Sequence, residues 1–425
     1  MDRQKKITFL VFTLVALFVM PVSAKKYRFH FGDGNKICYQ NVNPNTIYGS
    51  HSSFGYDLGT KPCVGNPYFF SVDLPEGNYR VTMVLGDKNR KTNTTIKTES
   101  RRLMLQNIVV PEGKFAKKTF NVNIRNKMIT SGTDTVRTKN REQNKLNWDN
   151  KLTLEINGEK PGLVSMTIEP VDVPTVFLAG NSTVVDQDDE PWCGWGQILP
   201  RFLNDKVSVA NYAESGEAGN SFISAKRFAK ILTKMKKGDY LFIEFGHNDQ
   251  KQEGESKGPY KSYQKSLKQM IDETRKKGAT PILVTPMNRR SFDENGKIIN
   301  TLGDFPDAMR QLAKKQNVML VDLNSMSKTL YEAWGDEASK KAFVHYPSGT
   351  FPNQTQPLAD NTHFNSYGGY EICKCVLKGL IDNGSPLKKY IVNDFGTFDP
   401  AHPDKEEDVI IAPTPFSSTI KPDGN

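Results

Sequence analysis

The hydrophobic pattern of this 425-residue chain changes at Pro174, and that change limits its possible folds more than any other feature. On the N-terminal side, short segments alternate apolar and polar residues, a period typical of half-buried strands. The clearest of these segments are 27–31, 79–84, 152–156 and 163–168. Clusters of Gly, Pro, Asn and Asp separate them, and residues 137–150 form a polar loop. Residues 25–172 are therefore predicted to form an all-β jelly roll or sandwich.

After Pro174, short apolar strands alternate with helical segments. The predicted strands are 175–179, 207–210, 240–245, 281–284 and 318–321. The clearest helices are 260–277, 305–315 and 367–381. Such alternation predicts a parallel sheet with helices on both faces, a three-layer α/β domain over residues 173–392. The tail, 393–425, is rich in Pro, Asp and Lys, and we expect loose structure there or a small docking segment.

The N-terminus has the features of an export signal. Basic residues at positions 3, 5 and 6 precede an apolar run from Ile7 to Met20, and Val22-Ser23-Ala24 is a small-residue cleavage site. A membrane anchor is the alternative, but a span needs about 20 apolar residues and this run is shorter. We therefore expect residues 1–24 to be a signal peptide. The mature chain is expected to be periplasmic or secreted, with no stable membrane span.

The charge of the chain bears on its partners. The formal net charge is +10, which favours an acidic partner such as nucleic acid, anionic lipid or an acidic polysaccharide. Export makes nucleic acid the least suitable of the three, and a pectic polysaccharide with uronic acids would suit the charge. The alternative is that the excess charge serves solubility alone.

The five cysteines are too few for a disulfide-dense framework. Cys38 and Cys63 could pair in an exported protein, and that question stays open. Cys373 and Cys375 fall in a helical pattern and are expected to contribute to packing. No Cys/His set has the spacing of a zinc site, so neither a metal nor another cofactor is expected.

Candidate catalytic residues follow the predicted strands, where α/β sheets bind their ligands. Ser182 follows the first strand at a strand-to-helix turn and could act as a nucleophile. His363 could take its proton, and Asp360, three residues earlier, could orient the imidazole. Taken singly, each is weak, because a Gly-x-Ser turn is usually a helix cap and a lone histidine is usually structural. Their shared placement beyond strand ends or before the last helix makes the case.

Acyl transfer also needs donors aimed at the developing oxyanion. The Ser182 N–H, the Gly216 N–H after the second strand and the Asn248 amide after the third could surround one oxygen. Arg289 and Arg290 follow the fourth strand and could bind uronate carboxylates, or could equally be solvated charges.

These residues resemble the sequence blocks of the SGNH hydrolases. Gly180-Asn181-Ser182, Gly216, Gly246-His247-Asn248-Asp249 and Asp360-x-x-His363 stand in the order of that family's blocks, within residues 175–387. Asn181 stands where many members have Asp, but Asn can make the same turn contacts. The resemblance implies a flavodoxin-like fold, with Ser182 as nucleophile, His363 as base and Asp360 as its partner. It also implies an oxyanion hole made by Ser182, Gly216 and Asn248.

Within that family the sequence is similar to rhamnogalacturonan acetylesterases, which share a Phe-Gly-His-Asn-Asp block and an Asn after the Asp-x-x-His motif. Phe245 and Asn365 match those positions. The β region resembles galactose-binding-like jelly rolls, which is a looser match. The resemblance implies an esterase that removes O-acetyl groups from an acetylated acidic polysaccharide without a metal.

Two other function classes stay open. Another SGNH esterase, such as a lipase or thioesterase, would need an apolar acyl tunnel. A non-catalytic glycan-binding protein would need no intact Ser182, Asp360 and His363. The segment Gly254–Gly258 also fits a Gly-x-Ser-x-Gly elbow, but a polar loop precedes it where an elbow needs a strand.

Overall fold

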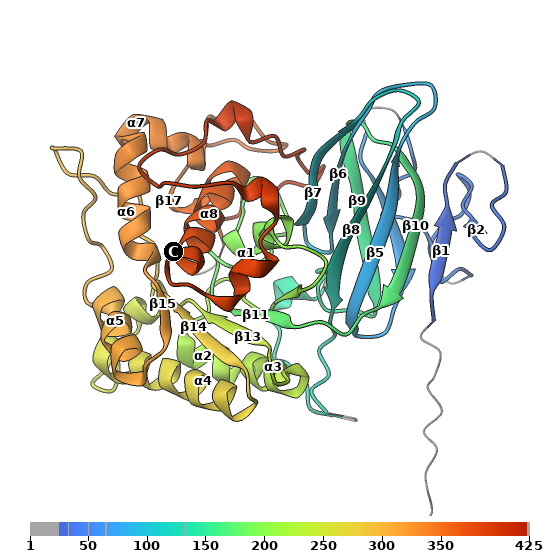
Figure 1. Cartoon of the computed structure of the whole chain (residues 1–425). Helices are drawn as coiled ribbons and strands as arrows, with labels where there is room; N and C mark the ends of the chain where they lie inside the picture. The colour runs from blue at the N-terminus through green and yellow to red at the C-terminus, as the bar shows by residue number, and fades with distance from the viewer. Residues whose placement is uncertain (1–24, 33, 50, 64–65, 131–132, 423–425) are drawn as a thin grey trace, which may run out of the picture.

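The computed structural model places an all-β part beside an α/β part (Figure 1). The structure describes residues 25–32, 34–49, 51–63, 66–130 and 133–422. The predicted signal peptide, residues 1–24, lies outside the described residues. Among the helices that are described, none combines the length and the apolar character needed to cross a bilayer.

The β part consists of two five-stranded sheets. One contains, in spatial order, β2 (Gln40–Asn41), β1 (Tyr27–His30), β10 (Leu163–Pro170), β5 (Gly77–Gly86) and β8 (Phe115–Ile124). The other contains β3 (Phe54–Asp57), β4 (Tyr68–Asp73), β9 (Lys151–Lys160), β6 (Thr92–Thr98) and β7 (Arg102–Val110). Alternate residues such as Val81 and Met83 on β5 face a core that Phe70 and Leu154 enter from the other sheet. This burial of one face per strand explains the period-two pattern.

The α/β part contains a five-stranded parallel sheet. Its spatial order is β12 (Ser208–Asn211), β11 (Thr175–Ala179), β13 (Tyr240–Ile243), β14 (Thr280–Val284) and β15 (Met319–Val321). Val176 and Leu178 face one buried cluster, whereas Phe177 and Ala179 face another. Both faces are thus buried, which is why these strands are mostly apolar.

Helices cover both faces of this sheet (Figure 1). One face is covered by α1 (Trp195–Ile198), α6 (Leu323–Trp334) and α8 (Ser366–Asp382). The other is covered by α2 (Gly219–Ser224), α3 (Arg227–Lys234), α4 (Gln264–Lys276) and α5 (Phe305–Gln316). After α6 come α7 (Asp336–Ser339) and an antiparallel hairpin of β16 (Phe343–Tyr346) and β17 (Leu358–Phe364). The parallel sheet with helices on both faces confirms the predicted α/β class, with an all-β part before it.

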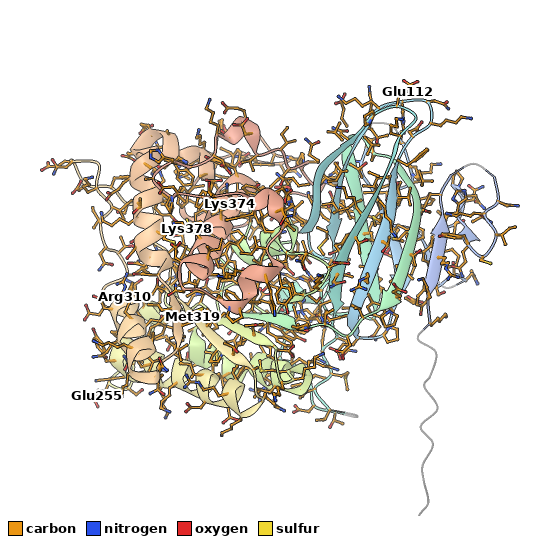
Figure 2. All side chains as sticks on the ribbon, in the orientation of Figure 1. Glu112, Glu255, Arg310, Met319, Lys374 and Lys378 are labelled. Atoms are coloured by element: carbon orange, nitrogen blue, oxygen red, sulfur yellow. The ribbon has the colours of Figure 1, made fainter. Side chains whose placement is uncertain are left out.

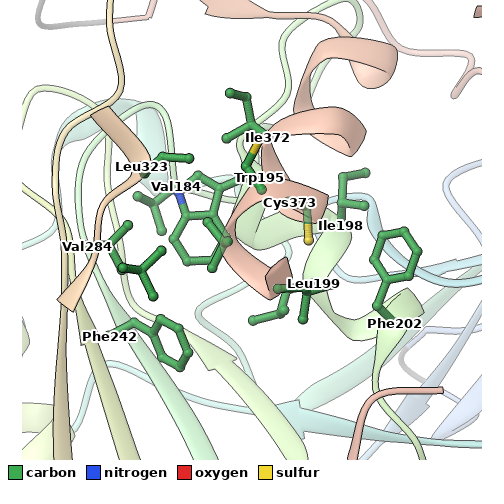
Figure 3. Close-up of a cluster of buried hydrophobic side chains, with 14 of the residues drawn as sticks. Val184, Trp195, Ile198, Leu199, Phe202, Phe242, Val284, Leu323, Ile372 and Cys373 are labelled. Atoms are coloured by element: carbon green, nitrogen blue, oxygen red, sulfur yellow. The ribbon is translucent and has the colours of Figure 1, made fainter. Parts of the chain in front are cut away.

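The cluster beneath α1 and α8 holds the largest fully buried side chain, that of Trp195 (Figure 3). Its ring lies 6.2 Å from that of Phe242 on β13. Cys373 and Cys375 on α8 are also fully buried, so they contribute to packing as expected. Cys38 and Cys63 are both exposed and free.

Of the two expectations for the tail, loose structure or a small docking segment, the contacts of the described residues up to 422 fit the second. The tail contains two short helical turns, η7 (Asn393–Phe395) and η8 (Glu406–Asp408), and then runs between the two parts. The Thr414 hydroxyl donates to Glu155 at 2.6 Å, and the Phe416 ring stacks on Phe69 with centroids 5.4 Å apart. These contacts have no helical or strand period that could predict them, because isolated side chains and backbone groups make them.

The β part meets the α/β part through buried ion pairs. Arg102 Nε lies 2.8 Å from Asp186 Oδ2, and both side chains are almost fully buried. The preceding residue, Arg101, pairs with Glu190 at 2.5 Å. Both carboxylates belong to the loop between β11 and α1, so the β part holds the segment that follows Ser182. Many other charged side chains face solvent, such as exposed Glu112 at the tip between β7 and β8 and Glu255 at the periphery of the α/β part (Figure 2).

Candidate active site

Ser182 lies in a tight turn directly after β11. The side-chain oxygen of Asn181 accepts the Thr183 N–H at 3.1 Å and the Thr183 hydroxyl at 2.8 Å. The N–H groups of Val184 and Val185 both donate to the Asn181 carbonyl at 3.0 Å. Asn181 therefore makes the turn contacts expected of it. The chain does not enter a helix directly after this turn, because the next helix, α1, begins at Trp195.

The structure brings Ser182, His363 and Asp360 together at the carboxyl edge of the sheet. His363 Nε2 lies 2.9 Å from Ser182 Oγ, although 181 positions separate the two residues in the chain. His363 Nδ1 lies 2.9 Å from Asp360 Oδ2, on the same strand, β17. The other Asp360 oxygen accepts the N–H groups of Thr362 at 2.7 Å and His363 at 2.9 Å. The contacts form a continuous chain from hydroxyl to imidazole to carboxylate, the geometry that nucleophilic acyl transfer requires.

Burial and neighbouring charges shift the pKa values of His363 and Asp360. Burial lowers the pKa of His363, which the hydrogen bond and negative charge of Asp360 only partly offset. The nearby Lys421 and Lys251 lower it further. Burial alone would raise the pKa of Asp360, but hydrogen bonds from His363 and the backbone hold it well below its usual range. The resting pair at neutral pH is therefore a neutral imidazole and an ionised carboxylate.

These shifts predict how activity depends on pH. A base must be neutral to accept the serine proton, so kcat/KM should fall as His363 becomes protonated. Because the folded-state pKa is lowered, half-maximal activity on the acid side is expected below about 6.5, the ordinary imidazole value. The measurement is kcat/KM for a neutral acetate ester across the acid range at constant ionic strength. An acid limb centred above the ordinary value would contradict this environment for His363.

The three expected oxyanion donors lie on the loops that follow β11, β12 and β13. Within the described residues, the backbone N–H groups of Ser182 and Gly216 have no hydrogen-bond acceptor. Gly216 has φ of 78°, a conformation that glycine adopts without a Cβ clash. Asn248 Nδ2 donates one hydrogen to the Glu217 carbonyl at 3.1 Å, which leaves its second hydrogen for another acceptor.

The two arginines expected to bind substrate have different surroundings. The Arg290 guanidinium is buried, with Nε 2.9 Å from Ser339 Oγ and a second contact to Asp336. It also donates to Asn361 Oδ1 at 3.0 Å, next to Asp360 in the chain. These contacts favour a structural role for Arg290, so we do not retain it as a substrate ligand. Arg289 instead contacts the neutral Gln250 side chain at 3.0 Å and lies in the field of Asp360.

Sequence reasoning did not find Glu244, which follows β13 and is fully buried behind the nucleophile turn. It accepts hydrogen bonds from Trp195 Nε1 at 2.5 Å and from the Thr183 hydroxyl at 3.0 Å. Burial raises the pKa of this carboxyl to about 7. A glutamate within an otherwise apolar run, residues 240–245, was the available signal, because a buried carboxyl needs partners. Its contacts join α1 to the turn that holds Ser182.

Comparisons with known proteins agree with this fold and site. Residues 178–368 match the GDSL-like Lipase/Acylhydrolase family. Rhamnogalacturonan acetylesterase RhgT of Bacillus subtilis is 44% identical over 223 residues, which are 52% of this chain and 95% of that protein. The probable rhamnogalacturonan acetylesterase YesY of Bacillus subtilis is 34% identical over 52% of this chain and 98% of its own length. The chain belongs to the GDSL-like lipase/acylhydrolase family.

The solved structure of YxiM from Bacillus subtilis covers 85% of this chain and 99% of its own, with 22% identity and a TM-score of 0.47. The family match begins at residue 178 and ends at 368. The β part and the tail therefore lie outside the matched region.

Proposed function

We propose that this protein is a serine esterase that removes O-acetyl groups from a pectic polysaccharide such as rhamnogalacturonan. The observation that carries the proposal is the unbroken contact from Ser182 Oγ through His363 to Asp360, with both hydrogen bonds 2.9 Å long. The names of the relatives supply the substrate class, because RhgT is a rhamnogalacturonan acetylesterase and YesY is named as a probable one. The match spans nearly the whole length of each. The net charge of +10 suits an acidic polymer.

In this proposal Ser182 is the nucleophile, His363 the general base and Asp360 the group that orients the imidazole. Ser182 Oγ attacks the ester carbonyl while His363 Nε2 takes the hydroxyl proton. The oxyanion receives the N–H groups of Ser182 and Gly216 and the free hydrogen of Asn248. Collapse releases the sugar alcohol, which takes the proton from His363. Water then attacks the acetyl-enzyme with the same base, releases acetate and restores the serine hydroxyl.

The hollow at the mouth of the site favours a sugar acetate over a long acyl chain. It has a volume of about 230 Å³. Its walls combine charged groups of Arg141, Lys145, Asp189 and Lys421 with the apolar side chains of Trp192, Ile420 and Pro422. The Trp192 ring stands edge-on to the His363 imidazole with centroids 5.6 Å apart. A lipase or thioesterase would need a long apolar channel, whereas a small hollow that combines charged groups with an aromatic ring suits a carbohydrate.

The proposal extends to location and domains. Residues 1–24 are proposed to be a signal peptide that directs the chain to the periplasm or the medium, supported by the basic, apolar and small-residue sections of that segment. The mature chain would then comprise a β domain (25–172), a hydrolase domain (173–392) and a tail (393–425). A polymeric pectic substrate is consistent with export, because such polymers do not cross the inner membrane intact.

Acetate release from acetylated pectin fractions, compared with acetylated xylan, tests the substrate class directly. We expect faster release from the pectic substrate, because its carboxylates complement the cationic mouth of the site. A series of aryl esters from acetate to octanoate tests the acyl group in parallel. We expect the rate to fall steeply beyond acetate. A preference for octanoate, or equal release from both polysaccharides, would contradict the proposal.

A further inference from the structure

Three cationic side chains gather around the catalytic carboxylate. Lys421 Nζ lies 3.5 Å from Asp360 Oδ2, and its side chain remains half exposed. Arg289 lies in the field of the same carboxylate, and the positive charges of Arg289 and Lys421 both act on Lys251. We call Lys251, Arg289 and Lys421 the cationic rim.

The cationic rim has too few acidic partners. Among the described residues, Asp360 is the one carboxylate within 4.0 Å of any of these three cations, and Lys421 alone reaches it. The Arg289 guanidinium contacts neutral groups, the Gln250 amide at 3.0 Å and the Thr301 carbonyl at 3.4 Å. Asp360 is already hydrogen-bonded to His363. Partial burial together with the fields of Arg289 and Lys421 lowers the pKa of Lys251 to about 8. An anion placed here would relieve this repulsion.

Other cations near the mouth are compensated. Arg141 donates to Glu214 Oε1 at 2.7 Å. Lys145 Nζ lies 2.8 Å from Asp188 Oδ2 and 3.5 Å from Glu214 Oε2. Among the described residues near the site, positive charge without a matching carboxylate is therefore concentrated in the cationic rim.

The tail places Lys421 at this position. The Ser418 carbonyl accepts the Trp192 indole N–H at 2.8 Å, and the Ser418 N–H donates to the Glu190 carbonyl at 2.8 Å. Phe416, two residues before Ser418 in the chain, stacks its ring on that of Phe69. These anchors lie within five residues of Lys421, so the ammonium is held over the site although the tail is far from Ser182 in sequence. The tail lies outside the family match, which ends at residue 368.

We infer that the cationic rim is a carboxylate-binding subsite, in which the tail residue Lys421 acts with Lys251 and Arg289 to hold the uronate carboxylate of a sugar at the acetylated position or next to it. The inference rests on the proposed function for the acetyl ester but makes a separate claim about the acidic group. Arg289 offers a planar fork that suits a carboxylate, and the two lysines contribute point charges. The subsite thus selects acidic over neutral acetylated glycans, and a segment beyond the hydrolase fold contributes to that choice.

The test uses the full-length chain and two readouts. The first is competitive inhibition of phenyl acetate hydrolysis by digalacturonate, which carries carboxylates but no acetyl group. The second is kcat/KM for acetylated rhamnogalacturonan oligosaccharides. For Lys421→Ala we expect the inhibition constant to rise about five- to tenfold and kcat/KM on the oligosaccharide to fall by a similar factor. Added salt should weaken digalacturonate inhibition of the wild type more than that of the variant.

Lys405→Ala is the matched control, because Lys405 is exposed and lies in the same tail, before the anchoring residues Phe416 and Ser418 in sequence. It should match the wild type in both readouts. Phenyl acetate turnover of Lys421→Ala, measured above the titration range of His363, separates binding from catalysis, and its change should be smaller than the change in the inhibition constant. Equal inhibition constants for Lys421→Ala and wild type would overturn the inference, as would tighter inhibition in the variant. If pectin is not deacetylated but digalacturonate still inhibits through Lys421, the proposed function fails and the subsite stands.

Discussion

Ser182→Ala is expected to lower kcat for acetate esters by about 10⁴- to 10⁶-fold. The reason is geometric, because His363 Nε2 lies 2.9 Å from Ser182 Oγ and no other described hydroxyl has such a contact with this imidazole. Without that oxygen no acetyl-enzyme forms, and only slow attack by water assisted by the remaining donors is left. The measurement is the rate of acetate release from phenyl acetate and from acetylated pectin. Active-site titration should also lose its initial burst.

Two further results complete this prediction. Ser224→Ala is the matched control, since Ser224 is an exposed serine on α2 whose hydroxyl donates only to the Ser221 carbonyl at 3.0 Å. That variant should keep wild-type rates. Ser182→Ala should still bind acetylated oligosaccharide, because the cationic rim and Trp192 are unchanged. Turnover within about tenfold of wild type in Ser182→Ala would exclude Ser182 as the nucleophile.

Much of the fold follows from hydrophobic period alone. The strand expected at 207–210 is Ser208–Asn211, and the helix expected at 367–381 is Ser366–Asp382. Alternation in the β part arises because one face of each strand packs against the other sheet. Continuous apolar runs in the α/β part arise because helices cover both faces of the sheet. These patterns are local, so a single sequence suffices to predict them.

Part of the candidate site could also be predicted from the sequence, for a related reason. A parallel sheet brings the carboxyl ends of its strands to one edge, so polar residues after several strands are expected to meet there. That argument places Ser182, Gly216 and Asn248 on adjacent loops, which is where the structure has them. It does not pair Ser182 with His363, because His363 lies on a hairpin strand outside the parallel sheet. The position of His363 before the last helix suggested that pairing, and the resemblance to a known family supported it.

Contacts between distant polar groups were not predictable. The contacts of the tail and of Arg290 are examples. A buried ion pair, or a side chain bound to a backbone carbonyl, leaves no periodic pattern in the sequence. Charged residues within the β part, such as Arg102, would be expected at a solvent-facing position from alternation alone. Instead Arg102 is buried at a second surface, where the β part meets the loop that follows Ser182. Such a contact becomes visible only when both partners are placed in space.

Arg102→Met should therefore lower the free energy of unfolding by about 3–5 kcal/mol, the usual effect of removing one partner of a buried pair. Methionine keeps most of the volume but leaves Asp186, which is fully buried, with Asn211 Nδ2 at 2.8 Å as its remaining close donor. Burial already raises the pKa of Asp186, and loss of Arg102 should raise it further. A carboxyl whose folded-state pKa is raised above its unfolded value destabilises the fold as pH rises. The deficit of the variant should therefore grow from acidic to neutral pH.

Urea unfolding of Arg102→Met at two pH values measures this loss in the free energy of unfolding. Two further variants show where the loss comes from. Lys268→Met removes an exposed ion pair with Asp272 on α4 and should cost no more than about 1 kcal/mol. Adding Asp186→Asn to Arg102→Met should restore part of the lost stability, because the unpaired charge is then absent. Because Asp186 follows Ser182 by four residues, Arg102→Met should also reduce activity before it unfolds the chain. A deficit below about 1 kcal/mol that does not vary with pH would mean that the β part does not hold the catalytic loop through this pair.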